Sequence, residues 1–419
     1  MKNISLIFEK ETKYNIFGIM LISLLPLALL SRSAILNSII IIINLLFLFI
    51  IFKEKKINFL NNKYFYALNI FWASLILNAC FSIDKINSLE RAVGFFRFVI
   101  LIFAIKFFLN LKDSKYQKII FIIWTTIFTV TTLDLIFESI FGFNMLGYVS
   151  YMPGRLAGFL NKELKIGHFY AAFILIALTT CHANLSKKNT FTYLIFFLFI
   201  IISFLIGERA NFLRVLIIAT IFLFLFEKKL LITKLIVLIF FIMTIFLIIN
   251  FNEKYKLRFW NQFIQPINEK SYKTYIQNSQ YGAHYETAKK IFKNNMLFGV
   301  GLKNYRNESS KEIYEDNNFL ETKARWATHP HQLHWELLSE TGLFGYSVFI
   351  IFFIFIFMSS IKSLIIQFNL YQLSSMLFIM ASVLPLIPSG SFFTTYGATL
   401  FWINFSVMIS AEGNRNTNI

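Results

Sequence analysis

Long runs of isoleucine, leucine and phenylalanine, separated by short polar segments, fill most of the chain. Most runs approach the roughly 20 residues that an α-helix needs to cross a bilayer. Twelve can be delimited, at 16–30, 34–52, 64–82, 93–109, 119–137, 167–183, 191–206, 212–226, 230–250, 342–361, 370–388 and 393–411. Inside a bilayer every backbone polar group must be paired within the protein, which favours helices. The pattern therefore predicts an all-α, polytopic membrane protein with about 12 transmembrane helices.

One long polar stretch, residues 252–341, divides this pattern into three parts. Residues 1–251 are expected to form transmembrane helices one to nine. Residues 342–419 are expected to form helices ten to twelve and a short tail. The stretch between them is predicted to be a large loop with helical segments, and it carries most of the candidate chemistry.

Two patterns within the long loop predict local structure. The segment 281–295 has apolar residues at helical spacing on one face, which predicts an amphipathic helix. Lysines occupy its other face, which we interpret as a solvated or headgroup-facing surface; they are Lys289, Lys290 and Lys293. The two glycines of FGVG, residues 298–301, would permit a tight backbone turn where this helix ends.

Composition agrees with a membrane protein, because 57% of the 419 residues are hydrophobic and only 15% are charged. The two cysteines, Cys80 and Cys181, lie in or beside apolar runs and suggest neither a disulfide framework nor a metal motif. The net charge of +18 comes from lysine clusters between spans, so it indicates topology rather than nucleic-acid binding. A second apolar run follows the first at once, so we expect the first to be retained and not cleaved.

The distribution of positive residues predicts the orientation of the chain. An even number of spans places both termini on one side of the membrane. The short segments on that side carry about twice as many lysine and arginine residues as the short segments on the other side. We therefore expect both termini in the cytoplasm and the long loop outside. In a Gram-negative cell this means the inner membrane, with a periplasmic loop.

The densest group of ionisable and aromatic residues is THPHQLHWELLSETGLFG, residues 328–345. Three of the six histidines lie in it, at His329, His331 and His334. Pro330 suits the first position of a helix and Gly342 the position just past its end, which predicts about three helical turns with His331 in the first. There the helix dipole would disfavour the imidazolium, and free N–H groups could bind a phosphate. A capping or packing histidine is the alternative.

A metal site and a nucleotide site are both disfavoured by this sequence. His331 and His334 are three residues apart, but no HExxH-like spacing accompanies them. Glu340 lies nine residues after His331 and so on the opposite helical face. It is expected to contact a neighbouring span. Walker A and Rossmann glycine motifs are absent from the sequence. An enzyme of this kind would use an already activated membrane substrate, without a cofactor.

Arginines at membrane depth usually have a partner or a function. Arg209, beside Glu208 in GERANFLR, either ends a helix with its neighbour or directs its planar guanidinium at a lipid-linked phosphate. Arg155, in a Pro-Gly frame, is either a headgroup anchor or a second phosphate contact. Arg97, inside the fourth run, is either part of a structural ion pair or a residue of a substrate pathway.

These motifs, in this order, resemble the O-antigen ligase and polysaccharide polymerase superfamily. The family has a GxG turn, then His-[Asn/Ser/Gln], then Glu-Thr-Gly-x-x-Gly. Here NMLFGVGLKNYR is followed by His331-Gln332 and by Glu340-Thr341-Gly342 with Gly345. The resemblance covers most of the chain and is strongest over 282–345. It implies a GT-C-like fold and a membrane glycosyltransferase that moves a glycan from undecaprenyl diphosphate to lipid A–core, without metal or nucleotide.

The resemblance also implies residue roles. The catalytic histidine of the family corresponds to His331, and its first essential arginine to Arg209. Where many ligases have a second arginine, this chain has His284, so the diphosphate contact would fall to that residue or to another nearby cation. The candidates for this contact are His284, Lys303, Arg306 and Arg325. The further candidates for substrate binding are Arg155, Arg214, His329 and Glu340.

Alternative functions remain at this point. A polymerase that extends the lipid-linked repeat would share the fold and the phosphate chemistry, and an oligosaccharyltransferase acting on protein is a smaller possibility. The GERANF turn and the HPHQ…ETG match favour the ligase. A glycolipid transporter would carry charged residues in several spans and a broken-helix repeat, whereas these spans are nearly uncharged. The expected partners are the lipid-linked glycan, the lipid A–core acceptor and membrane lipids, with no nucleic acid.

Overall fold

The computed structural model describes residues 12–111, 113–161, 163–184, 189–226, 231–316, 318–319 and 321–412. Within these ranges every regular element is a helix, which confirms the all-α prediction. Seven helices are long and apolar enough to cross a membrane, namely α4 (Ser33–Lys53), α6 (Lys85–Leu109), α7 (Ser114–Phe141), α8 (Ile166–Asn184), α10 (Arg209–Phe226), α11 (Leu231–Phe251) and α17 (Leu333–Ile366). The chain is thus a polytopic membrane protein.

Shorter helices complete the bundle. They are α2 (Lys13–Ser23), α3 (Leu25–Leu29), α5 (Lys63–Cys80), α9 (Asn189–Leu205), α18 (Leu370–Ser382) and α19 (Thr395–Ala411). The first predicted span is therefore two helices. Pro26 stands in the first turn of α3, where its missing N–H does not interrupt a helical hydrogen bond. Several helices begin at a side-chain cap that accepts a backbone N–H, as at Thr12, Asn62, Asp84, Asp113, Asn369 and Thr394.

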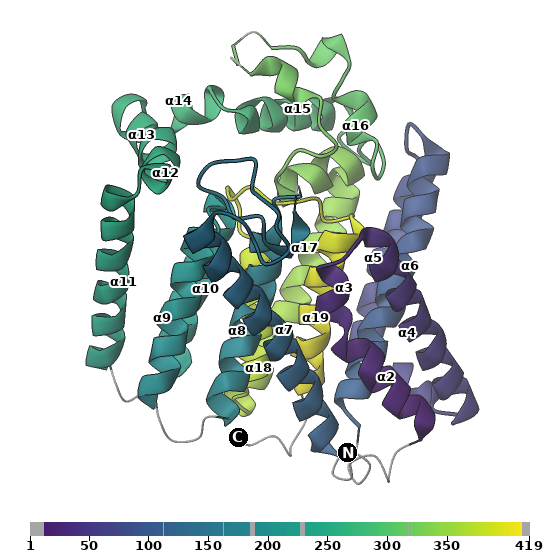
Figure 1. Cartoon of the computed structure of the whole chain (residues 1–419). Coiled ribbons are helices and arrows are strands. Elements are labelled where there is room, and N and C mark those ends of the chain that lie inside the picture. Colours follow the sequence, from purple (N-terminus) through teal and green to yellow (C-terminus); the bar gives the residue numbers. More distant parts are fainter. Residues whose placement is uncertain are drawn as a thin grey trace.

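The long loop covers one end of the bundle (Figure 1). Its helices are α12 (Glu253–Tyr255), α13 (Gln265–Lys270), α14 (Tyr272–Gln277), α15 (Gln280–Asn294) and α16 (Tyr305–Glu308), with a π-helix over Lys256–Ile264. The α15 helix is the amphipathic helix predicted over 281–295. Lys289 lies 3.3 Å from Glu286, and Lys290 lies 2.8 Å from Asp316, so part of the basic face is ion-paired.

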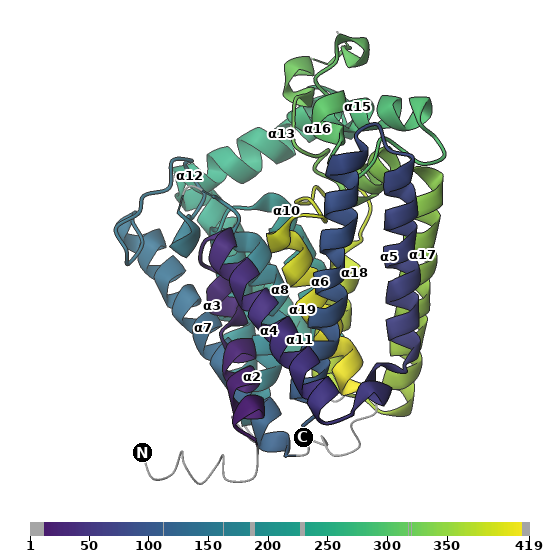
Figure 2. The ribbon, with the colours of Figure 1, turned by 90° about the vertical axis from the view of Figure 1, so that its right-hand side faces the viewer.

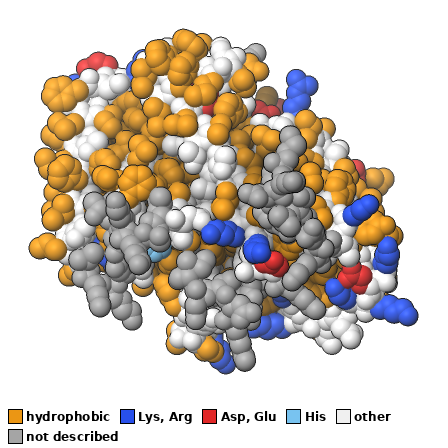
Figure 3. Space-filling view, turned by 60° about the horizontal axis from the view of Figure 1, so that its bottom comes forward, with side chains coloured by type: hydrophobic (Ala, Val, Ile, Leu, Met, Phe, Trp, Pro, Cys, Tyr) orange, Lys and Arg blue, Asp and Glu red, His pale blue; other side chains and the backbone are white. Residues whose placement is uncertain are grey.

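The start of α2 and the end of α19 both lie at the opposite end of the bundle (Figures 1 and 2), as expected for an even number of passes. Several lysine and arginine side chains lie on the face seen from this end (Figure 3). The charge pattern and the arrangement of the helices are therefore consistent with each other, and the cytoplasmic location of this end stays a prediction.

Aromatic residues join the helices from which the site is built. The ring of Trp402 on α19 is fully buried. Its centroid lies 5.7 Å from that of Phe95 on α6 and 6.2 Å from that of Phe352 on α17. Edge-to-face and offset arrangements at such distances stabilise apolar cores beyond their buried area. These ring contacts link the three helices inside the bundle.

The Gly342 position connects α17 to the loop. Gly342 has a φ of 62° and interrupts α17, as its sequence context predicted, but the helix resumes after it and runs to Ile366. A Cβ at Gly342 would lie 2.6 Å from the backbone nitrogen of Gly299, and one at Gly299 would lie 2.7 Å from the carbonyl oxygen of Glu340. Backbone hydrogen bonds from Val300 to Ser339 (2.9 Å) hold the same contact. The two glycine motifs therefore pack against each other.

Candidate functional site

A cavity of about 290 Å³ lies where the bundle meets the long loop. Three arginines and three histidines line it, and they come from separate segments of the chain. The arginines are Arg155 between α7 and α8, Arg209 at the start of α10 and Arg258 in the π-helix. The histidines are His168 at the start of α8 and His329 and His331 just before α17. We call this space the cationic cavity.

Two glycine turns position the first two arginines. Gly154 and Gly207 have φ angles of 72° and 74°, which L-residues with a side chain rarely adopt. The N–H of Leu156 donates to the carbonyl of Ile206 over 3.1 Å, so the two turns lie against each other. The Pro-Gly-Arg and Gly-Glu-Arg sequences, which begin 54 residues apart, are thereby brought to one wall of the cavity.

Glu208 neutralises Arg155 and not its neighbour Arg209. Its carboxylate lies 3.0 Å from the Arg155 guanidinium and accepts the N–H of Gly167 over 3.1 Å. Burial alone would raise the pKa of Glu208, but its hydrogen bond to His168 and the charges of His168 and Arg155 lower it overall. Glu208 and Arg209 lie where α10 begins, but their side chains contact different partners and do not pair with each other.

Arg209 and Arg258 keep their charge without a carboxylate partner among the described residues. Arg209 donates to the carbonyl of Gln262 over 3.2 Å and lies 5.5 Å from the ring of Phe263. Arg258 donates through Nε to the carbonyl of Gly207. Burial, with the charges of Arg209 and Arg155, lowers the pKa of Arg258 to about 10, so it stays protonated at pH 7. Two uncompensated guanidinium groups thus face one cavity, which suits an anion.

His331 lies outside the helix, which corrects the prediction that placed it in the first turn. The helix α17 begins at Leu333, and Gln332 is its N-cap, with its side chain accepting the N–H of Trp335 over 2.8 Å. His331 itself has a φ of 54°. The reason is that Gln332 can cap the helix, so Pro330 does not occupy the first helical position. The carbonyl of His331 accepts the N–H of Ser389 over 2.7 Å.

The histidines group by tertiary contact and not by sequence. The ring centroids of His329 and His331 are 4.1 Å apart, and that of His284 on α15 lies 5.0 Å from His331. His334, by contrast, points away and contacts the hydroxyl of Tyr346 (3.1 Å) and the carbonyl of Val383 (2.8 Å). His334 therefore has a structural role in α17.

Burial keeps the grouped histidines neutral. It is the largest cause that lowers the pKa of His331, followed by the charge of His168. Burial and the neighbouring histidines lower the pKa of His329 to about 3 and that of His284 to about 4. The neutral imidazole expected of His331 is thus retained, but its cause is desolvation and not the helix dipole. A neutral imidazole can accept a proton at pH 7.

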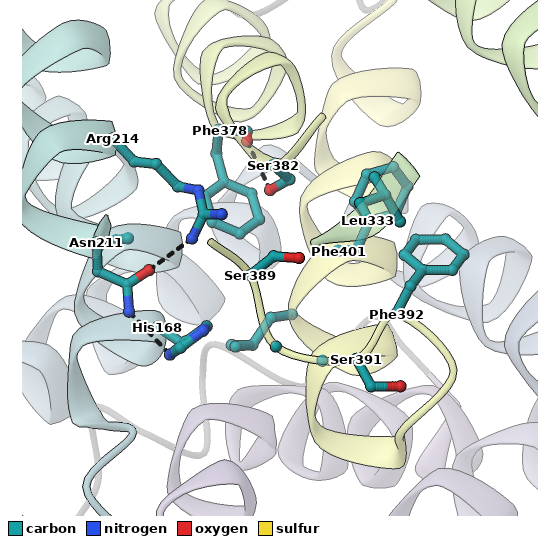
Figure 4. Close-up of a pocket in the computed structure, with 14 residues that line it drawn as sticks. His168, Asn211, Arg214, Leu333, Phe378, Ser382, Ser389, Ser391, Phe392 and Phe401 are labelled. Atoms are coloured by element: carbon teal, nitrogen blue, oxygen red, sulfur yellow. Dashed lines mark hydrogen bonds between the residues drawn. The ribbon is translucent and has the colours of Figure 1, made fainter. Parts of the chain in front are cut away.

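Arg214 lies behind the cationic cavity in a smaller, mostly apolar space of about 70 Å³ (Figure 4). Its guanidinium donates to the carbonyl of Pro388 over 2.7 Å and to Asn211 over 2.9 Å. The amide nitrogen of Asn211 in turn lies 2.8 Å from Nδ1 of His168. Arg214 therefore positions wall residues of the cationic cavity and does not line it.

The remaining predicted residues lie elsewhere. The carboxylate of Glu340 is buried and accepts the backbone N–H groups of Lys303 and Tyr305, so it contacts the loop and not a neighbouring span as expected. The guanidinium of Arg325 is buried beside Glu315, at 3.4 Å. None of these residues, nor His284 or Arg306, lines the cationic cavity within the described part of the chain.

Two residues of the cavity were missed by the sequence reasoning. Arg258 gave only a weak signal, as a single arginine followed by two aromatic residues in KLRFW, shortly after the ninth predicted span. Its position in a π-helix is a stronger signal, because such segments recur at functional sites, but it exists only in three dimensions. His168 gave no spacing that tied it to Arg209. Within the described ranges no three His, Cys, Asp or Glu side chains form a group that could hold a metal ion.

Comparison with known proteins gives one family. A family model described as O-antigen ligase matches residues 194–350, the region that contains Arg209, Arg258 and His331. No curated protein matches the chain. The resemblance noted from the sequence motifs is confirmed by this match.

Proposed function

We propose that this chain, whose residues 194–350 match the O-antigen ligase family, is a membrane glycosyltransferase. It would move a glycan from undecaprenyl diphosphate to the sugar of lipid A–core at the loop-covered face. The single observation that carries this proposal is the cationic cavity, in which Arg209 and Arg258 stand beside His331. The family supplies the class of reaction, and the cavity supplies groups for its two chemical demands, which are a bound diphosphate and a base.

The diphosphate of the donor would bind the guanidinium groups. Arg209 and Arg258 carry uncompensated positive charge, and planar guanidinium groups suit bidentate binding of phosphate oxygens. Nδ1 of His168 is held by the Asn211 amide nitrogen at 2.8 Å and by Glu208 at 3.4 Å, and its Nε2, which has no hydrogen-bond partner among the described residues, could donate to an oxygen of the diphosphate. In the low dielectric of this cavity, such donors would stabilise the negative charge that develops on the leaving group. In this proposal Arg258 takes the second arginine role, for which the sequence offered His284, Lys303, Arg306 and Arg325.

His331 would act as the base. The acceptor hydroxyl oxygen forms a bond to the anomeric carbon while the bond from that carbon to the diphosphate oxygen breaks, and the electron pair leaves with the diphosphate. The hydroxyl proton passes to the neutral imidazole of His331. Direct displacement of this kind inverts the anomeric configuration. Neither a metal nor a nucleotide is required, because the lipid diphosphate is already a good leaving group.

A polymerase of the same superfamily would use the same cavity with a different acceptor. Deletion of the gene with complementation separates the two, read on a lipopolysaccharide gel and a blot for lipid-linked polymer. Loss of the ladder from lipid A with accumulation of undecaprenyl-linked polymer supports the ligase. Transfer of a single repeat without chains supports the polymerase. If His331→Ala and Arg209→Ala both restore the wild-type pattern, the assignment of the cavity is wrong.

A further inference from the structure

A second cavity, of about 340 Å³, lies at the loop-covered end of α6. Its walls include Glu90, Arg91, Gly94 and Arg97 of α6, together with Phe393 from the segment that precedes α19. The residues Ile86, Glu90, Val93 and Arg97 follow at helical spacing and so share one face of α6. Ile86 and Val93 on this face are 83% and 58% exposed, so the cavity opens toward the apolar surroundings of the bundle.

The two arginines of this cavity have no carboxylate partner within the described part of the chain. Arg97 donates to the hydroxyl of Thr395 over 3.2 Å, and its guanidinium lies over Gly94, at 3.3 Å from where a Cβ would stand. Its Nε is buried and, among the described residues, meets no hydrogen-bond acceptor. A buried charged donor without a partner is costly. The ion-pair alternative for Arg97 is therefore wrong, and the side chain has capacity for an anionic ligand.

Two further cations come to this place from the long loop. The turn after α15 packs on the start of α6, where Asn304 donates to Ser88 over 3.2 Å and Ile83 donates to the carbonyl of Val300 over 3.1 Å. Burial, then the charges of Arg91 and Arg306, lower the pKa of Lys303 to about 8. Lys303, which the sequence offered as a candidate for the donor diphosphate together with Arg306, is thus near Arg91, and Arg306 is near Lys303.

The segment 388–393 runs from the cationic cavity to the second cavity. Gly390 lines the first and Phe393 lines the second. Three residues of extended chain span at most about 11 Å, so the walls of the two cavities come near each other along this segment. Glu336 fixes the segment, because its carboxylate accepts the hydroxyl of Ser391 and the N–H of Phe392, the latter over 2.9 Å.

We propose that the Arg91–Arg97 cavity binds a phosphate group on the sugar headgroup of the acceptor glycolipid, which places the acceptor hydroxyl at the cationic cavity. The role of this site in the reaction rests on the proposed function, whereas the binding of phosphate does not depend on it. A guanidinium pair with a nearby lysine favours phosphate, and the exposed apolar face of α6 suits the lipid part of the same molecule. The second cavity would therefore determine which acceptors are used.

The test uses the full chain reconstituted in nanodiscs of zwitterionic lipid. We would measure the affinity for a phosphorylated glycolipid and for the same glycolipid after enzymatic removal of phosphate, and separately the affinity for a lipid diphosphate. The variant Arg91→Gln/Arg97→Gln is compared with Arg32→Gln, an exposed arginine that does not line the second cavity. Loss of charge-assisted hydrogen bonds predicts about a tenfold or greater loss of affinity for the phosphorylated glycolipid.

The double variant should bind the dephosphorylated glycolipid and the lipid diphosphate with wild-type affinity. This result would also show that the variant is folded. Equal affinity of the wild type for the two glycolipids would overturn the proposal. So would equal competition by phosphatidylglycerol, which would make the cavity a general site for anionic lipid. If binding behaves as expected but no glycan is transferred, the proposed function fails while the phosphate site stands.

Discussion

The backbone of Gly207 lies so close to Gly154 that a methyl group at 207 would overlap the carbonyl oxygen of Gly154 and stand 2.9 Å from its carbonyl carbon. A Cβ at Gly154 would lie 2.8 Å from the carbonyl oxygen of Lys254. Three segments distant in sequence therefore meet at two glycines. The segments joined in this way carry Arg155, Arg209 and Arg258.

Replacement of Gly207 by alanine should disrupt the cationic cavity. Gly142 is the matched control, because it has a φ of 82° but meets nothing within 4 Å of the added Cβ. Gly142→Ala should carry only the cost of the positive φ, about 1–2 kcal/mol. Gly207→Ala should carry that cost and the steric overlap, with a lower thermal midpoint and loss of glycan transfer. Similar thermal midpoints for the two variants would contradict this account of the contact.

Arg258→Ala should lower glycan transfer by about 100-fold or more, the usual result of removing a donor that stabilises developing charge. Arg258→Lys should retain only part of the wild-type rate of glycan transfer, because an ammonium cannot make the bidentate contact. Transfer kinetics in reconstituted membranes measure both variants. Lys254→Gln, an exposed residue of the same segment, is the control. Wild-type transfer by Arg258→Ala would show that the donor binds elsewhere.

The pH dependence of transfer should follow His331. The neutral imidazole is the active form, and its pKa is lowered from the usual value by burial and by His168. Activity should therefore persist as the pH falls through about 6.5, the usual imidazole value, and decline only below it. The pH profile of kcat/KM checks this. An acid limb centred above pH 6.5 would mean that another group controls the reaction.

Acid should also destabilise the fold through His284. Its pKa is about 4 in the folded protein, against about 6.5 for an unfolded chain. The unfolded state therefore binds more protons between these values, so this contribution to stability is complete above about pH 6.5 and is lost as the pH falls toward 4. His284→Gln should flatten the decline of the thermal midpoint over this window. An unchanged slope would show that His284 is not a source of the acid sensitivity.

Glu336→Gln should loosen the segment between the two cavities. The amide has one acceptor oxygen where the carboxylate accepts from both Ser391 and Phe392. A lost intramolecular hydrogen bond costs about 0.5–1.5 kcal/mol. Hydrogen exchange over 388–393 should increase, whereas Glu312→Gln, at an exposed loop position, should leave it unchanged. Equal exchange in the two variants would rule out this role.

The sequence by itself determined the membrane-spanning class of the protein, the amphipathic α15 helix and the break at Gly342. These features depend on local periodicity, on length and on the conformational freedom of single residues, all of which can be read along the chain. The motif match also carried His331 and Arg209 to their positions in the family. The roles of these two residues remain predictions.

Only the tertiary structure decided which cations share a cavity. Arg258 lies beside Arg209 because its Nε donates to the carbonyl of Gly207, and Lys303 lies near Arg91 because its turn packs on the start of α6. His331 leaves the helix because Gln332 caps it instead. Each outcome depends on contacts between segments far apart in the chain. Such contacts are set by close packing and by the pairing of buried polar groups, neither of which leaves a periodic signal in the sequence.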